Sequence, residues 1–218
     1  MNKRSSSEQK GSVILHTSKQ KPVMILVHEI YGINDHMKSM IDYFDKAGFE
    51  VYCPHLLGQV QHFPYVSENE AYDYFMNKVG FDEPVKSVLN LAKELKTKNA
   101  AIDIFLLGFS VGATIAWRCS QNDQLFTGVI GFYGSRIRDD VDLAPACKTL
   151  LFFPEIEASF NPREIVSVLE KKDQLCVTIV EGEHGFANPY SAVFHAESKN
   201  RCFQEIDEFI KVCLLKEE

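Results

Sequence analysis

The sequence has no block of lysine or arginine residues. Its 218 residues include 23 Lys and Arg against 30 Asp and Glu, which gives a formal net charge of -7 at pH 7. A protein that binds the phosphate backbone of a nucleic acid needs a concentrated basic face, because its affinity depends on the release of counterions. The composition therefore argues against nucleic acid as a partner.

Long apolar runs are also missing. The runs at 102–109 and 150–154 are far shorter than the ~20 residues that a membrane-spanning helix needs. The opening segment, MNKRSSSEQKG, has a charged start but no apolar stretch behind it, which is not the pattern of a secretory signal. We therefore expect a cytoplasmic protein that does not cross a membrane, with residues 1–11 as a flexible N-terminal tail.

The cysteines lack the spacing of a metal site. They form no CxxC pair and do not cluster with histidines, so we expect neither zinc nor another metal centre. We interpret them as reduced, mostly buried small hydrophobic residues. The six are Cys53, Cys119, Cys147, Cys176, Cys202 and Cys213.

Hydrophobic residues make up 45% of the chain and charged residues 24%, which is enough to bury the core of a single domain. Apolar runs of strand length alternate with segments of helical period. This alternation predicts an α/β fold with a mostly parallel, twisted sheet and helices on both faces. Strands are expected at 13–16, 23–27, 50–53, 102–107, 128–133, 149–153 and 175–180.

Helical periodicity appears at 37–44, 85–95 and 203–213. Asn161 followed by Pro162 indicates the start of another helix, because Asn is a good N-cap and proline suits the first helical position. The stretch 59–80 is the least regular part of the interior. We expect it to border a site.

A G-x-S-x-G motif follows one of the predicted strands. Gly108-Phe-Ser110-Val-Gly112 comes directly after the apolar run and leads into a predicted helix. In this context the serine lies on a sharp strand-to-helix turn, where the glycines avoid collisions and the hydroxyl projects above the sheet. The free N–H groups at the start of the helix would face the site of reaction. We interpret Ser110 as a nucleophile rather than as part of an ordinary tight turn.

A serine nucleophile needs a base, and His184 is the best candidate. In hydrolases with this turn the chain order is serine, acid, histidine, and the partners lie on loops after later strands. His184 follows the strand predicted at 175–180, in a Glu-Gly-Glu-His-Gly-Phe loop whose glycines allow it to present the ring. The alternative is a surface-loop histidine. We interpret His16, His28 and His195 as structural.

The acid of the triad is expected after the strand predicted at 149–153. Two carboxylates, Glu155 and Glu157, compete there, and their spacing does not separate them. Either could instead be a solvated loop charge. The residues alone leave this choice open.

Several segments together have a more specific pattern than the serine motif alone. They are VHEIYGIN at 27–34, AGFEVYCP at 47–54, the motif at 108–112, FYG at 132–134 and HGFA at 184–187. In order and approximate spacing they resemble the dienelactone hydrolase family of the α/β-hydrolase superfamily. The resemblance covers nearly the whole chain and implies an α/β-hydrolase fold.

The resemblance also implies roles for individual residues. The segment Phe153-Pro-Glu-Ile-Glu157 overlays the family's F-G-x-x-D, which favours Glu157 as the acid. The implied set is Ser110 as nucleophile, His184 as base, Glu157 as acid, and the backbone N–H groups of Ile30 and Val111 as the oxyanion hole.

Glu29 would point towards the nucleophile. In the family this glutamate resembles a regulator of a cysteine nucleophile, but this chain has Ser110 in place of that cysteine. Glu29 therefore has no thiolate to regulate. It either positions the Ser110 turn and the Ile30 loop or is a buried structural carboxylate. His55 also departs from the pattern, since the family commonly has Asp there.

The substrate is where the chain differs most from the family's namesake. By resemblance, the namesake has an arginine of a carboxylate-binding site at the position of Asn188. The stretch 59–80 of this chain contains no arginine either. Both features argue against dienelactone itself as the substrate. Arg136 or Arg138 could replace the anion contact, or be solvated. Tyr31, Arg136 and Asn188 are the candidate substrate contacts.

The implied activity is hydrolysis of a small carboxylic ester or lactone through an acyl-serine, with no metal or organic cofactor. About fifteen residues separate Tyr133 from the next predicted strand, which leaves little room for a cap domain and favours small soluble esters over lipids. Two alternatives remain: a catalytically silent relative that acts as a binding protein, and a thioesterase or peptidase on the same fold. We expect a monomer or small homo-oligomer.

Overall fold

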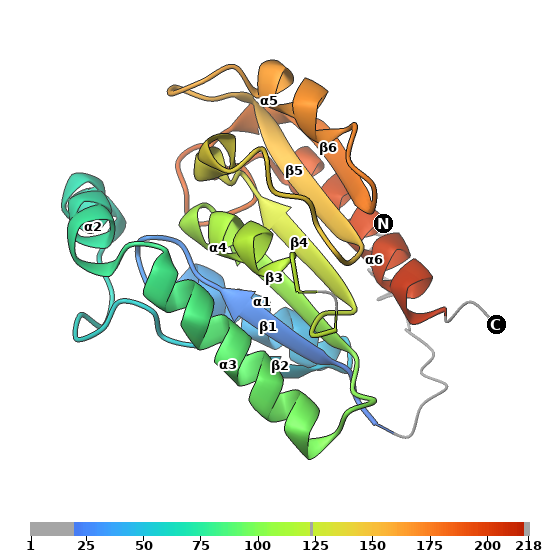
Figure 1. The fold of residues 1–218 in the computed structure, drawn as a ribbon. Coiled ribbons are helices and arrows are strands. Elements are labelled where there is room, and N and C mark those ends of the chain that lie inside the picture. The colour runs from blue at the N-terminus through green and yellow to red at the C-terminus, as the bar shows by residue number, and fades with distance from the viewer. Residues whose placement is uncertain (1–19, 123, 216–218) are drawn as a thin grey trace, which may run out of the picture.

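The computed structural model describes residues 20–122 and 124–215. Its centre is a six-stranded sheet in the order β2-β1-β3-β4-β5-β6, in which every neighbouring pair is parallel (Figure 1). The strands are β1 (Val23–Val27), β2 (Glu50–Tyr52), β3 (Ile104–Phe109), β4 (Gly128–Phe132), β5 (Thr149–Ile156) and β6 (Leu175–Glu183). Six of the seven predicted strands are confirmed. The strand predicted at 13–16, His16 and the tail predicted at 1–11 lie outside the described residues.

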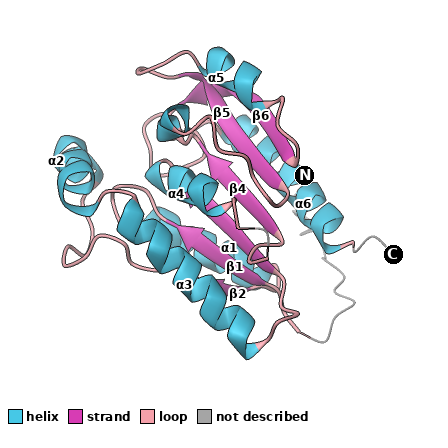
Figure 2. Ribbon diagram, in the orientation of Figure 1, coloured by secondary structure: helices cyan, strands magenta, loops and turns pink. Residues whose placement is uncertain are grey.

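Helices cover both faces of the sheet (Figure 2). They are α1 (Asp35–Lys46), α2 (Glu68–Tyr74), α3 (Asp82–Lys98), α4 (Val111–Cys119), α5 (Pro162–Leu169) and α6 (Ala196–Leu214). Side chains from α3, α4 and α5 pack on one face, and side chains from α1 and α6 pack on the other. Strands buried on both faces are apolar along their whole length, which is why the sequence shows continuous rather than alternating runs.

Residues of one strand alternate between the two cores. In β1, Ile25 packs with Val88 of α3 and Ile115 of α4, whereas Leu26 packs with Met37 of α1 and Ile206 of α6. All six of these side chains are fully inaccessible to solvent. The sheet is therefore held rigidly between two helical layers, and the ends of its strands can position loops accurately.

The prediction that 59–80 is irregular is wrong for most of that stretch. It contains a 3₁₀ helix (η1, Tyr65–Ser67), the helix α2 and a π-helical turn (η2, Phe75–Val79). Only Ala71 and Phe75 of these elements are fully buried, so the segment has almost no apolar period from which a helix could be recognised. This excursion lies apart from the sheet (Figure 1).

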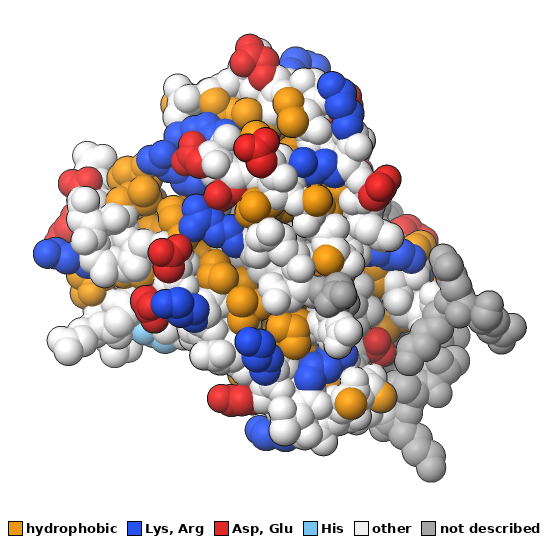
Figure 3. Space-filling model, viewed as in Figure 1, with side chains coloured by type: hydrophobic (Ala, Val, Ile, Leu, Met, Phe, Trp, Pro, Cys, Tyr) orange, Lys and Arg blue, Asp and Glu red, His pale blue; other side chains and the backbone are white. Residues whose placement is uncertain are grey.

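The segment between β4 and β5 carries one short 3₁₀ helix, η3 (Ser135–Asp139), and no inserted cap. Asn161 caps α5, as predicted, by accepting a hydrogen bond from the Arg163 N–H at 3.1 Å. None of the helices in the described ranges is both long and apolar enough to cross a membrane. On the face seen in Figure 3, basic and acidic side chains are interspersed.

The cysteines are free thiols. Cys119, Cys147 and Cys202 are buried, and Cys53 and Cys213 are partly buried, as expected of small hydrophobic residues. Cys176 is exposed, because its side chain lies on the partly open edge strand β6, and the prediction of burial is wrong for it.

The start of α4 lies against the ends of β1 and β3 with no room for a side chain. A Cβ on Gly112 would lie 2.3 Å from the carbonyl oxygen of Val27 and 2.7 Å from that of His28. A Cβ on Gly108 would lie 2.1 Å from the carbonyl oxygen of Gly112. Backbone cannot yield as a flexible side chain does, so both glycines of the motif are required by this close approach.

The Gly112→Ala variant tests this packing. Alanine normally stabilises a helix by about 0.5–1 kcal/mol relative to glycine, but here we expect a loss of roughly 3 kcal/mol or more because the methyl group meets backbone. Gly80→Ala is the control, since Gly80 has φ 66° and ψ -163° but nothing within 4 Å, so it bears a conformational cost of about 1–3 kcal/mol without a backbone clash. Urea unfolding followed by circular dichroism measures both. A Gly112→Ala protein as stable as the parent would contradict the account.

Candidate active site

Ser110 occupies a strained turn between β3 and α4. Its backbone has φ 55° and ψ -119°, a conformation that costs a residue other than glycine about 1–3 kcal/mol. The turn is fixed by the Ser110 N–H, which donates to the Phe132 carbonyl at 2.9 Å, and by the Ser110 carbonyl, which accepts from Ala113 at 3.0 Å. This is the strand-turn-helix placement that the motif predicts.

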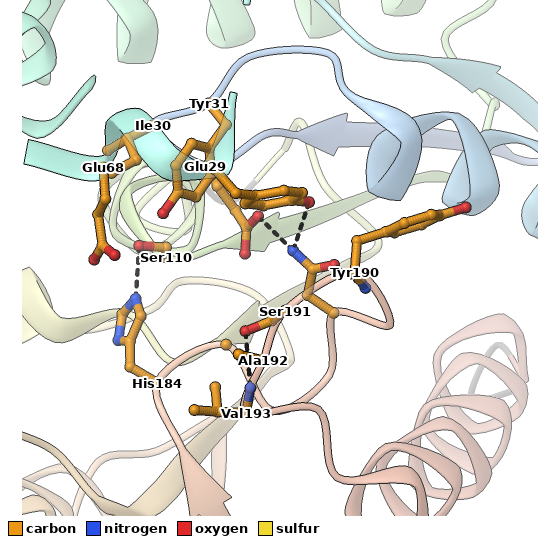
Figure 4. A pocket seen from close by; sticks show the side chains of 13 residues that line it. Glu29, Ile30, Tyr31, Glu68, Ser110, His184, Tyr190, Ser191, Ala192 and Val193 are labelled. Atoms are coloured by element: carbon orange, nitrogen blue, oxygen red, sulfur yellow. Dashed lines mark hydrogen bonds between the residues drawn. The ribbon is translucent and has the colours of Figure 1, made fainter. Parts of the chain in front are cut away.

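Ser110, His184 and Glu157 form a continuous chain of hydrogen bonds. The Ser110 Oγ lies 2.9 Å from His184 Nε2 (Figure 4), and His184 Nδ1 lies 2.6 Å from Glu157 Oε1. The Glu157 side chain is 5% exposed and that of His184 is 37% exposed. This arrangement suits a tautomer in which Nδ1–H donates to the carboxylate and Nε2 accepts from the serine hydroxyl.

The structure separates the two competing carboxylates. Glu157 is the residue directly after β5, and its side chain turns inward to His184. Glu155 lies within β5, is exposed, and pairs with Arg163 at 2.8 Å. Only Glu157 is placed to orient the histidine.

The backbone N–H groups of Ile30 and Val111 are unused. Ile30 lies on the loop after β1, and Val111 is the first residue of α4. Neither N–H donates to an acceptor anywhere in the described part of the chain. First-turn N–H groups of a helix have no intrahelical partner, so both groups are available to a ligand beside Ser110.

A cavity of about 290 Å³ opens in front of Ser110 and His184 (Figure 4). Its walls come from the loop after β1, from the start of the 65–79 excursion and from the loop after β6. The lining residues are Glu29, Ile30, Tyr31, Tyr65, Glu68, Ser110, His184, Gly185, Asn188, Tyr190, Ser191, Ala192 and Val193. The expectation that 59–80 borders a site holds for Tyr65 and Glu68.

Comparison with known proteins agrees with this geometry. Residues 10–214 match the model of the dienelactone hydrolase family. The chain is 41% identical over 177 residues to the uncharacterized protein YczH of Bacillus subtilis (strain 168), covering 80% of this chain and 85% of that protein. The chain belongs to the dienelactone hydrolase family. The resemblance predicted from the motifs is thereby confirmed.

Solved structures of low sequence identity share the fold. A dienelactone hydrolase-like promiscuous phosphotriesterase from metagenomic libraries is 15% identical, with 89% of this chain and 87% of that chain covered and a TM-score of 0.68. A cold-adapted esterase from an Arctic intertidal metagenomic library is 13% identical, with 86% and 82% covered and a TM-score of 0.64. The predicted α/β-hydrolase fold is confirmed.

In this member of the dienelactone hydrolase family, Glu29 is the centre of a buried polar network. Its carboxylate accepts hydrogen bonds from the Tyr133 hydroxyl and from Asn188 Nδ2, both at 3.1 Å. Asn188 Nδ2 also donates to the Tyr65 hydroxyl at 2.9 Å, as does Asn34 Nδ2. The network ties the loops after β1, β4 and β6 together beneath the cavity.

His36 completes the network from α1. Its ring is fully buried, and its Nδ1 lies 3.6 Å from Glu29 Oε2, an ion-pair distance too long for a hydrogen bond. Burial by itself raises the pKa of Glu29, but His36, His184 and the Tyr133 hydroxyl outweigh it and hold the pKa below its ordinary value. Glu29 is therefore ionised at neutral pH. His36 could not be recognised from the sequence, because it lies one residue before the apolar stripe of its helix.

The candidate substrate contacts fall into two groups. Tyr31 lines the cavity, with its ring edge-on to Tyr65 at 4.7 Å between centroids. Asn188 also lines it, but its amide is committed to the network around Glu29. Arg136 is not brought to the cavity, because its guanidinium is bonded to Tyr72 and Asp139. Arg136 does not line the cavity, and its contact with a substrate stays a prediction.

Arg138 does not supply the anion contact either. It donates to the Ser135 carbonyl at 2.7 Å and lies over the ring of Phe160 at 5.3 Å from the centroid. No arginine of the described residues therefore lines the cavity. The residues that sequence reasoning missed are Tyr65, Glu68 and 190–193, which carry no motif of their own.

His28 holds the loop that carries Ile30. Its Nδ1 lies 2.7 Å from the Glu29 carbonyl, and its Nε2 accepts from the Leu56 N–H at 3.0 Å. Burial lowers the pKa of His28 to about 4, so the ring is neutral at physiological pH. The interpretation of His28 as structural agrees with these contacts. His195, also interpreted as structural, caps α6 by accepting from the Ser198 N–H.

A pH titration of the His28 imidazole by ¹⁵N NMR tests its role. We expect a midpoint near pH 4, with the proton on Nδ1 above it. Because the unfolded chain binds this proton near pH 6.5 and the folded one does not, the stability of the fold should fall as the pH drops from 6.5 to 4, by up to about 1.4 kcal/mol per pH unit. A midpoint near 6.5 in the folded protein would contradict this.

Proposed function

We propose that this protein is a serine hydrolase that cleaves small carboxylic esters or lactones through an acyl-serine intermediate. The observation that carries the proposal is the hydrogen-bonded chain from Ser110 Oγ through His184 to Glu157, with the nucleophile on a strained turn. Such strain persists only where the surrounding structure enforces it, and it is concentrated at functional sites. Strain at the head of this hydrogen-bonded chain supports a catalyst rather than a silent binding protein.

The first half of the reaction acylates Ser110. The Ser110 Oγ attacks the carbonyl carbon of the ester while His184 Nε2 takes the hydroxyl proton. The tetrahedral oxyanion accepts hydrogen bonds from the N–H groups of Ile30 and Val111, each of which is worth about 10²–10³-fold in rate in other enzymes. His184 then gives its proton to the departing alkoxide, and the carbon–oxygen bond breaks.

The second half releases the acid. A water molecule takes the place of the alcohol, loses a proton to His184 Nε2 and attacks the acyl carbonyl. The second tetrahedral intermediate collapses with Ser110 as the leaving group, and His184 returns the proton to its oxygen. Throughout, Glu157 fixes the histidine tautomer and stabilises the imidazolium form. The buried position of Glu157 strengthens this interaction because little water competes for the carboxylate.

The size of the cavity supports a small substrate. A volume of about 290 Å³ is at the lower limit for sites that hold small molecules. No cap is inserted between β4 and β5 that could add an apolar lid. These features favour small soluble esters over lipids.

The two neighbouring glutamates provide a matched test. Glu157→Gln should lower kcat/KM for p-nitrophenyl acetate by about 10²–10⁴-fold, because the amide no longer stabilises the imidazolium or fixes its tautomer. Glu155→Gln should change it by less than about twofold, since it removes only an exposed ion pair. Ser110→Ala sets the background rate, and circular dichroism shows whether each variant folds. Equal losses in the two glutamine variants, or turnover by Ser110→Ala, would refute the assignment.

A further inference from the structure

The cavity beside Ser110 has an acidic lining. Its two acidic residues are Glu29 and Glu68, and no lysine or arginine of the described residues lines it. The Glu29 carboxylate accepts hydrogen bonds from Tyr133 and Asn188, and His36 Nδ1 lies 3.6 Å from it. Glu68 is exposed and makes no ion pair with any described residue. An uncompensated carboxylate therefore faces the space that the substrate must enter.

Aromatic rings occupy the same wall. Tyr31 and Tyr65 meet edge to face, and both line the cavity with Glu68 and Glu29. Burial raises the pKa of Tyr31, and the negative charges of Glu68 and Glu29 raise it further, so the ring stays neutral. Neutral tyrosine rings attract cations through the negative potential of their faces.

We infer that the ester cleaved at Ser110 carries a positively charged group, such as an alkylammonium, that lies against Tyr31, Tyr65 and Glu68. This inference rests on the proposed function and names its substrate class. A carboxylate-bearing substrate is disfavoured at the same place, because it would meet like charge and find no arginine. Arg136 and Arg138, the nearest candidates in the sequence, are held by Tyr72, Asp139 and the Ser135 carbonyl.

The expected preference for a cationic substrate follows from its interactions with the tyrosine rings and with Glu68. A cation over a tyrosine ring at a partly exposed site and an exposed ion pair each contribute a few-fold in affinity. Together they should give a preference of about tenfold for a cationic substrate over a neutral one of the same shape. The Glu68 contribution should weaken at high salt, since charges at the surface are screened.

Three thioesters of matched size test the inference. They are acetylthiocholine, which is cationic, S-(3,3-dimethylbutyl) thioacetate, its neutral isostere, and S-acetyl-3-mercaptopropionate, which is anionic. Thiol release gives kcat/KM for each. We expect the order cation, neutral, anion, with about tenfold between the first two at low salt and a smaller ratio at 0.5 M KCl.

Glu68→Gln and Glu70→Gln form the matched pair of variants. Both residues lie in the first turn of α2 and are exposed, but only Glu68 lines the cavity. Glu68→Gln should reduce the cation-to-neutral ratio by about three- to fivefold, and Glu70→Gln should leave that ratio unchanged. Equal effects of the two variants would mean that the ratio depends only on the net charge of the protein. That result would contradict a cation site at Glu68.

A second measurement covers the case in which the three thioesters are too large to enter the cavity. Inhibition of p-nitrophenyl acetate hydrolysis is compared for choline, for its neutral isostere 3,3-dimethylbutan-1-ol and for propionate. Choline should inhibit best. Hydrolysis of p-nitrophenyl acetate without any preference for the cation in either series overturns the inference and leaves the proposed function intact. If p-nitrophenyl acetate itself is not hydrolysed, the proposed function fails and the inference fails with it.

Discussion

The close approach of α4 to the ends of β1 and β3 is the constraint on which the site depends. Gly108 and Gly112 allow three backbones to meet at distances that no side chain would permit. Only this approach lets Ser110 adopt its positive φ, place its hydroxyl 2.9 Å from His184 and leave the Val111 N–H free. The strained backbone of Ser110 is held by this close packing together with the hydrogen bonds of Ser110 to Phe132 and Ala113.

The parallel sheet brings the rest of the site together at the carboxyl ends of its strands. Ser110, Tyr133, Glu157 and His184 are each the residue directly after a strand, namely β3, β4, β5 and β6. Parallel strands end on the same side, so residues far apart in sequence meet there without a special connection. The loop after β1 adds its own residues from the same direction. The hydrogen-bonded residues Ser110, His184 and Glu157 lie there, and the network around Glu29 connects the neighbouring loops.

The serine and histidine were predictable because strong local patterns surround them. Ser110 stands between a buried strand and a helix, and His184 lies in a glycine-containing loop after a strand. The choice between Glu155 and Glu157 was not predictable from the residues, because both follow the same apolar run and only side-chain direction separates them. Family resemblance pointed to Glu157, and the contact with His184 agrees.

Other features had no pattern to reveal them. The helices at 65–79 bury only two of their side chains completely, so they lack a readable period. His36 contacts Glu29 through a tertiary pairing that leaves no trace in helical spacing. Arg136 and Arg138 were plausible anion contacts by position, but local partners hold both guanidinium groups. The charge character of the cavity is therefore a property of the folded chain.

The most direct test of the account is the site of covalent labelling by a fluorophosphonate. Such reagents phosphonylate a serine only where a base and an oxyanion hole activate it. After treatment at neutral pH, intact-mass and peptide mass spectrometry should show one added group per chain, on the peptide that contains Ser110. No label on the folded protein, or a label on a different residue, would contradict the claim that Ser110 is an activated nucleophile.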